Sequence, residues 1–96
     1  MSPQNKKKLN SLRKQLDKLD DNLFKIIKKR TNIIKQVIST KEYKYEIVDK
    51  KRINKILSNI KNKSLKNNID PKITNRIWKN MIWSYIDFEK RNFKKK

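Results

Sequence analysis

Two positively charged residues on one long amphipathic stretch are the clearest chemical signal in the sequence. Arg30 occupies a seam position of residues 9–41 where an apolar residue is expected, and a buried guanidinium needs an anionic partner. Lys41 follows about 20° around a helix and about 16 Å along it, so both side chains can reach a small anion between them. Two interpretations stay open: Arg30 binds an anionic ligand in a helical bundle, or it snorkels or pairs with Asp20 or Asp21 across a helix pair.

Arginine positions are informative in this chain because Lys supplies most of the positive charge. A planar guanidinium is favoured over an ammonium where a carboxylate must be held by two parallel hydrogen bonds. Arg13 lies about 25 Å before Arg30 along the helix, too far to share a ligand with it in one chain. An antiparallel copy of the helix could bring Arg13 to the partner's Arg30 and Lys41. The arginines are Arg13, Arg30, Arg52, Arg76 and Arg91.

Carboxyl groups also fall on apolar helix faces. Glu89 continues an apolar row at helical spacing, so its carboxyl group is predicted to point toward the core. The alternative is a Glu at the edge of the stripe that pairs with Lys90 or Arg91, or is solvated. Asp49 and Arg52, three residues apart, share the face of another apolar stripe.

The composition excludes several kinds of chemistry. The sequence has no Cys and no His, which excludes thiol nucleophiles, disulfides, thiolate or imidazole metal sites, and His-based acid/base catalysis. We therefore expect no metal and no cofactor. No apolar run approaches 18 residues and no apolar segment follows the basic start, so neither a membrane span nor a signal peptide is predicted. A cytoplasmic protein is expected.

The formal net charge of +19 raises the question of nucleic-acid binding, since clustered Lys neutralise phosphates. The Lys residues are scattered over all segments, however, and Lys, Asn and Ile dominate the composition as they do in AT-rich coding sequences. Nucleic acid is therefore an unlikely partner. A basic helical nucleic-acid-binding module is the alternative from another functional class.

A single long helix must position the first of these residues. Residues 9–41 contain no Pro or Gly and would form a rod of roughly 50 Å. A chain of 96 residues cannot wrap a monomeric core around both ends of such a rod, so a homodimer is predicted. The seam, at alternating steps of three and four, is Leu9, Leu12, Leu16, Leu19, Leu23, Ile26, Arg30, Ile33 and Val37.

The remaining elements complete an all-α domain over residues 1–96, with three helices of long, short and medium length. After a connector at 44–48, a second helix is expected from about Asp49 into the Asn- and Lys-rich residues that end at 68. Asp70 followed by Pro indicates an N-cap and the first position of a third helix ending near Phe93. Residues 1–8 are expected as a flexible lead and 94–96 as a basic tail.

Taken in order, these motifs resemble the all-helical chorismate mutases, a family that also includes isochorismate pyruvate lyase. The resemblance extends from about Leu9 to Phe93. It implies an intertwined, domain-swapped-like homodimer with two active sites, each completed by an arginine of the other protomer. The motifs that carry it are Leu12-Arg13, Leu19-Asp20, Leu23, Arg30, Lys41, Asp49-x-x-Arg52 and Ser84-Tyr85-Ile86-Asp87-Phe88-Glu89.

The resemblance also implies residue roles. Arg30, Lys41 and Glu89 would be catalytic, with Lys41 and a protonated Glu89 facing the ether oxygen of the substrate. Arg52 would support the anionic substrate, and Asp49 would hold the substrate end of the second helix. The implied substrate-binding residues are Arg13 from the other protomer, Arg30, Lys41, Asp49, Arg52, Tyr85 and Glu89.

Two positions depart from the pattern of the best-known bacterial mutases. Ile53 stands where that pattern has a Glu that accepts the ring hydroxyl, and Tyr85 stands where it has a Ser. Both resemble the lyase, whereas Glu89 replaces the lyase's Gln. The implied activity is the rearrangement of chorismate to prephenate in phenylalanine and tyrosine biosynthesis, and salicylate-forming isochorismate pyruvate lyase is the alternative.

Overall fold

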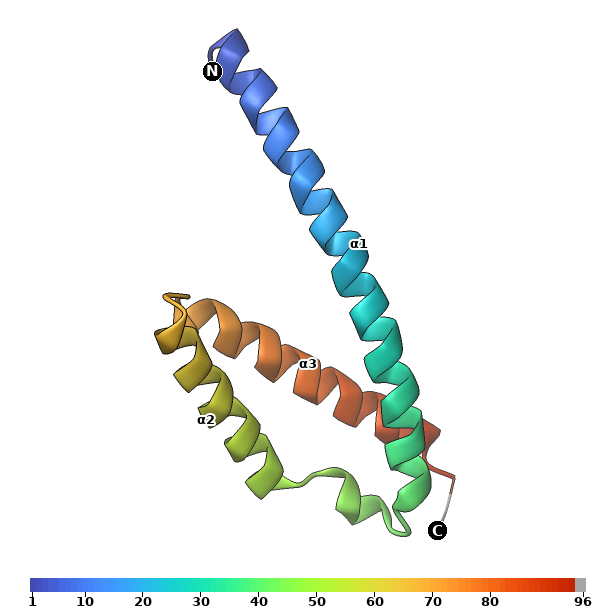
Figure 1. Ribbon diagram of the computed structural model, residues 1–96. Coiled ribbons are helices and arrows are strands. Elements are labelled where there is room, and N and C mark those ends of the chain that lie inside the picture. Colours follow the sequence, from blue (N-terminus) through green and yellow to red (C-terminus); the bar gives the residue numbers. More distant parts are fainter. Residues whose placement is uncertain (95–96) are drawn as a thin grey trace. The chain divides into compact units, whose positions relative to one another are not determined.

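The protein is all-helical in the computed structural model, which describes residues 1–94 (Figure 1). Its elements are α1 (Pro3–Thr40), the short 3-10 helix η1 (Lys44–Ile47), α2 (Lys50–Lys66) and α3 (Pro71–Asn92). Three α-helices of long, short and medium length are thus confirmed. The chain forms two compact units, Met1–Ile33 (unit 1) and Ile34–Lys96 (unit 2).

Helix α1 begins earlier than the sequence pattern predicted. The Ser2 hydroxyl accepts a hydrogen bond from the Asn5 backbone N–H at 3.1 Å, and the Ser2 carbonyl accepts one from Lys6 at 2.9 Å. Pro3 occupies the first helical turn, where its missing N–H costs nothing. Most of residues 1–8, expected as a flexible lead, therefore belong to the helix. At the other end of the chain, Lys94 follows α3, and residues 95–96 of the expected tail lie outside the described residues.

Unit 1 consists of α1 residues whose apolar seam is uncovered. Leu19, near the middle of the seam, is 61% exposed, and Leu12, Leu16 and Leu23 are exposed as well. Helices in water gain most of their stability by packing an amphipathic face rather than from helix propensity. The seam of α1 thus leaves a large apolar surface for another helix to cover.

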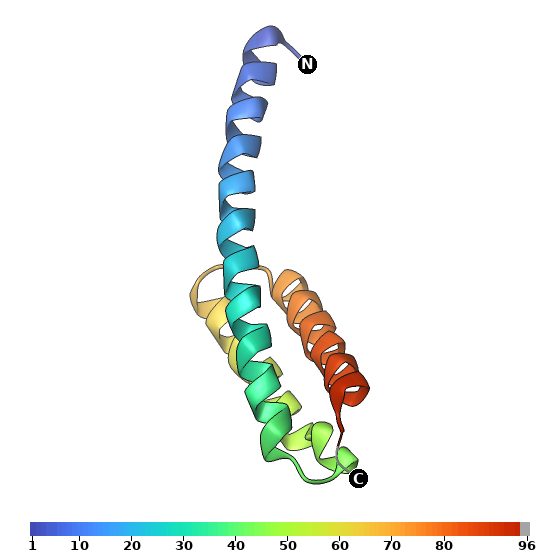
Figure 2. The same cartoon turned by 90° about the vertical axis from the view of Figure 1, so that its right-hand side faces the viewer.

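Unit 2 has α2 and α3 packed together and running in opposite directions (Figure 2). The α2 stripe is half-buried, as its spacing predicted, and consists of Ile53, Ile56, Leu57 and Ile60. Helix α3 contributes Ile86, and η1 packs against α3 and contributes Ile47, which is 3% exposed. Among residues 1–94, Ile47 and Ile86 are the buried apolar residues. So small a core is consistent with a chain that completes its core by association.

The turn between α2 and α3 follows from local sequence. The Ile69 N–H donates to the Ser64 carbonyl at 2.9 Å and the Asn68 N–H to the Leu65 carbonyl at 3.5 Å, a Schellman-type end of α2. Asn68 has φ 55, and Asn tolerates this left-handed conformation better than most residues in a chain that has no Gly. The Asp70 carboxylate then accepts from the Lys72 N–H at 2.9 Å, which confirms the predicted N-cap.

Two hydroxyl groups connect α2 to α3. Ser64 Oγ lies 2.7 Å from Thr74 Oγ1 and 2.7 Å from the Ile60 carbonyl oxygen. Each hydroxyl has one proton. The short bond from Ser64 to the Ile60 carbonyl uses that of Ser64, so Ser64 accepts from Thr74, whose contact with the Pro71 carbonyl is longer at 3.4 Å. Ser64 is buried, so this bond fixes the register of the two helices at the end remote from Glu89.

Candidate active site

Lys41 and Glu89 form the central feature of unit 2. Lys41 Nζ lies 3.0 Å from Glu89 Oε1, and the two side chains are 18% and 6% exposed. Lys41 follows directly after α1, where its N–H still donates to the Ile38 carbonyl at 3.1 Å. Glu89 comes from the last turns of α3. Residues 48 positions apart are thus brought into contact, and the carboxyl group does point toward the core.

Glu89 pairs with Lys41 and is not solvated at the edge of its stripe. Arg91 instead pairs with Asp87, through Nε and Oδ2 at 2.9 Å, in a pair that is two-thirds exposed. Such an exposed pair contributes little to stability. The cation that Glu89 contacts comes from a different part of the chain, which local spacing could not indicate.

A nearly buried ion pair demands an explanation other than stability. Removing two charges from water costs several kcal/mol per ion, and apolar residues of similar volume often stabilise as well or better. The structure leaves no buried side-chain N or O atom without a partner among the residues it describes, so the pair satisfies its own polar groups. An ammonium has three donors, and a carboxyl group accepts when ionised and donates when protonated. Together the two side chains can present two donors to one oxygen of a ligand.

Asp49 and Arg52 meet at the start of α2. Asp49 Oδ1 accepts a hydrogen bond from the Arg52 backbone N–H at 3.0 Å, so Asp49 is the N-cap of α2. Both side chains are exposed. This cap explains why α2 begins where the sequence predicted. It also fixes Asp49 at the end of α2 next to the loop that follows Lys41.

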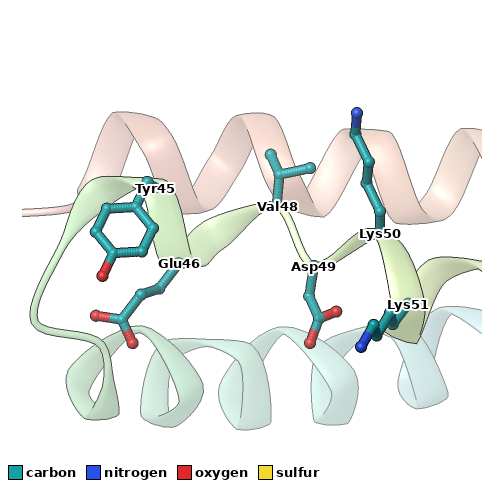
Figure 3. A pocket seen from close by; sticks show the side chains of 6 residues that line it. All are labelled: Tyr45, Glu46, Val48, Asp49, Lys50 and Lys51. Carbon is teal, nitrogen blue, oxygen red and sulfur yellow. The ribbon is translucent and has the colours of Figure 1, made fainter.

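A shallow pocket of about 570 Å³ lies beside this cap (Figure 3). In Figure 3 the Glu46 and Asp49 carboxylates and the Lys51 ammonium extend toward one side of the loop, and Lys50 extends toward the other. The pocket is open, so it offers charged groups to a ligand without enclosing one. Its lining residues are Tyr45, Glu46, Val48, Asp49, Lys50 and Lys51.

Tyr85 and Ile53 are half-buried residues of unit 2. Tyr85 stands four residues before Glu89 on α3 and therefore shares its face of the helix. Ile53 belongs to the first turns of α2 and offers no hydrogen-bonding group. Neither position supplies the Glu or Ser of the best-known bacterial pattern.

Arg13 and Arg30 are exposed residues of unit 1. Their arrangement toward a ligand, and that of the Arg52 side chain, stays a prediction from the sequence. The structure therefore unites Lys41 with Glu89 and places Asp49 beside Arg52 through a backbone bond.

Glu46 has a structural role that sequence reasoning missed. Its Oε1 accepts hydrogen bonds from the backbone N–H groups of Glu42 at 3.2 Å and Tyr43 at 2.9 Å. This is the Glu half of a capping box, in which a Glu at the third helical position reaches back to the residue that begins the helix. The usual Ser or Thr is replaced by Tyr43, so the sequence signature is incomplete. Only the spacing from Tyr43 to Glu46 could have indicated it.

Residues 1–94 offer neither a carboxylate cluster for a metal ion nor a membrane-spanning helix. These residues include no group of three or more His, Cys, Asp or Glu side chains arranged to hold a metal ion. Over the same range, none of the helices has the length and apolarity required to cross a membrane.

Comparison with known proteins identifies the family of this helical chain. The family model for chorismate mutase type II matches residues 12–90. The chain belongs to this family, whose members are generally enzymes. No curated protein and no solved structure matches it.

Proposed function

We propose that the protein is a chorismate mutase, which converts chorismate to prephenate and so serves phenylalanine and tyrosine biosynthesis. Family membership supports chorismate mutase-type activity. The observation that carries the more specific proposal is the contact between Lys41 and Glu89 in a site with little exposure to water.

The reaction makes modest demands on a protein. One C–O bond breaks and one C–C bond forms within the same substrate molecule, so no nucleophile and no proton transfer is required. A sequence without Cys or His is therefore suited to it. Catalysis then depends on holding the reactive conformation and stabilising the transition state.

Lys41 and Glu89 would act on the ether oxygen. Negative charge grows on that oxygen as the C–O bond breaks, and donors fixed in a site of low exposure bind the transition state better than the ground state. In the free protein Lys41 donates to Glu89. We expect the substrate to replace this bond with one bond from Lys41 and one from protonated Glu89, both to the ether oxygen.

Two arginines would hold the substrate's carboxylates. In this proposal Arg30 acts within its own protomer and Arg13 comes from the partner, with Arg52 and Asp49 at the start of α2 completing the anionic site. The exposed seam of α1 supports a homodimer, because a second copy could cover Leu12, Leu19 and their neighbours. Fixing both ends of a flexible dianion selects its reactive geometry.

Isochorismate pyruvate lyase activity is the second candidate. Half-buried Ile53 provides no acceptor for the chorismate ring hydroxyl, and Tyr85 shares the helix face of Glu89. Both residue types resemble the lyase. Glu89, a Glu rather than a Gln, favours the mutase.

Parallel assays of the purified protein with chorismate and with isochorismate test these alternatives. We expect loss of chorismate absorbance with formation of prephenate, and a lower kcat/KM for isochorismate. Formation of salicylate and pyruvate from isochorismate, with chorismate unchanged, would assign the protein as the lyase. Inactivity on both substrates would refute the proposed function.

A further inference from the structure

The loop between α1 and α2 carries Lys41 at its start and Asp49 at its end, yet it has no Pro to restrict it. Such a segment has many accessible conformations, and fixing each residue costs conformational entropy. The hydrogen bonds within the loop therefore decide how well Lys41 is positioned.

The Glu46 side chain accepts two of these bonds. Glu46 Oε1 accepts from Glu42 N–H at 3.2 Å and from Tyr43 N–H at 2.9 Å, and the Glu46 N–H donates to the Tyr43 carbonyl at 3.1 Å. Glu42 and Tyr43 are the two residues that directly follow Lys41. The carboxylate thus closes the loop immediately beyond the lysine.

The other side of Glu46 is anchored to α3. Ile47, the next residue, is 3% exposed, and η1 packs against α3, the helix that carries Glu89. Glu46 therefore joins a fixed point on α3 to the backbone beside Lys41. No other side chain in residues 41–49 accepts two backbone N–H groups in the hydrogen bonds described for this loop.

We propose that Glu46 is a positioning residue for Lys41: by closing the loop it holds the Lys41 ammonium at the carboxyl group of Glu89. Its effect on catalysis rests on the proposed function, in which Lys41 donates to the substrate. Its effect on the contact between Lys41 and Glu89 does not.

Variants at Glu46 distinguish the effect of side-chain length from the effect of side-chain charge. Glu46→Gln loses the charge but keeps an oxygen at the same distance, so it should keep most of the activity. Glu46→Asp keeps the charge but is one methylene shorter, and it should lower kcat about 10- to 100-fold, as small misplacements of catalytic groups do. Glu42→Ala is the matched control, because it removes a neighbouring charge and leaves both N–H groups in place; its activity should stay within about twofold of wild type. A fully active Glu46→Asp with an impaired Glu46→Gln would overturn the proposal in favour of a charge effect.

If Glu46 acts through Lys41, its substitution should have no effect on kcat once Lys41 is replaced. In the Lys41→Met background, Glu46→Asp should cause no additional loss of kcat, because the group that it positions is gone. An equal loss in both backgrounds would mean that Glu46 acts on the whole fold, and would overturn the proposal.

A measurement without substrate completes the test. Lys41→Met and Glu89→Gln, alone and combined, should give non-additive shifts of Tm in the wild-type background and additive shifts in the Glu46→Asp background. The same non-additivity in both backgrounds would overturn the positioning role. If the wild-type protein is inactive on chorismate, the proposed function fails, while this comparison still decides whether Glu46 positions Lys41.

Discussion

Substitution of Glu89 gives the sharpest prediction about catalysis. Glu89→Ala removes one of the two donors proposed for the ether oxygen, and a missing oxyanion donor costs about 10²–10³ in kcat, or about 2.7–4 kcal/mol. The side chain is 6% exposed, so water can replace the lost donor only by entering the space that the substitution leaves. Glu89→Gln has nearly the same volume and donates at every pH, and we expect it to retain activity.

The contrast between Glu89→Gln and Glu89→Ala distinguishes a donor from a structural ion pair. The amide of Gln donates a hydrogen bond but carries no charge to pair with Lys41. Glu89→Gln should therefore keep kcat/KM near that of wild type if the side chain acts as a donor, and should lose it if the charge of the pair is what matters. Steady-state assays of wild type, Glu89→Gln and Glu89→Ala provide the comparison.

Stability must be measured alongside these rates. Glu89→Ala leaves the Lys41 ammonium without its partner, and breaking a buried pair in this way costs up to about 3–5 kcal/mol. Lys41 is still 18% exposed, which reduces that cost. Asp87→Ala is the matched control, because it removes an exposed carboxylate from the same helix and should change kcat/KM by about twofold or less. A Glu89→Gln protein as inactive as Glu89→Ala would refute the donor role.

Three further substitutions test other parts of the structure. Leu19→Asp places a charge in the exposed seam of α1 and should convert a dimer to monomers in analytical ultracentrifugation; an unchanged sedimentation coefficient would contradict the helix pairing. Ile53→Glu should lower KM for chorismate, by at most the factor that corresponds to about 1.5–3 kcal/mol of binding free energy, and leave KM for isochorismate unchanged. Equal changes of KM for the two substrates would count against mutase specificity. Ser64→Ala should cost about 1–3 kcal/mol of unfolding free energy in thermal denaturation, because Thr74 keeps only its longer contact, 3.4 Å, with the Pro71 carbonyl, and kcat should not change.

The secondary structure could be predicted closely because its signals are local. The apolar period of α1, the Asp49 and Asp70 caps and the Pro after Asp70 are readable from neighbouring residues. The early start of α1 was not predicted because the apolar period begins only at Leu9 and Pro3 is also typical of an unstructured lead, although Ser2 provides a cap for the helix.

The contacts of the site were only partly predictable. Helical spacing indicated that Glu89 faces the core, but a partner 48 residues away depends on how the loop after α1 returns to α3. The resemblance to chorismate mutases implied that both residues face the same substrate oxygen, but not that they contact each other in the free protein. Glu46 was missed for a related reason, since its two bonds are to backbone groups of a loop whose conformation no residue pattern specified.

Complementation between Arg13→Ala and Arg30→Ala is the most direct test of a chorismate mutase site that is shared between two protomers. Each variant alone should be inactive, because every site lacks one arginine. After the two are mixed, unfolded and refolded together, half of the dimers should be mixed, and one site in each mixed dimer retains both arginines. We therefore predict recovery of roughly a quarter of the wild-type rate of prephenate formation. A refolded mixture as inactive as its parents would contradict the shared site.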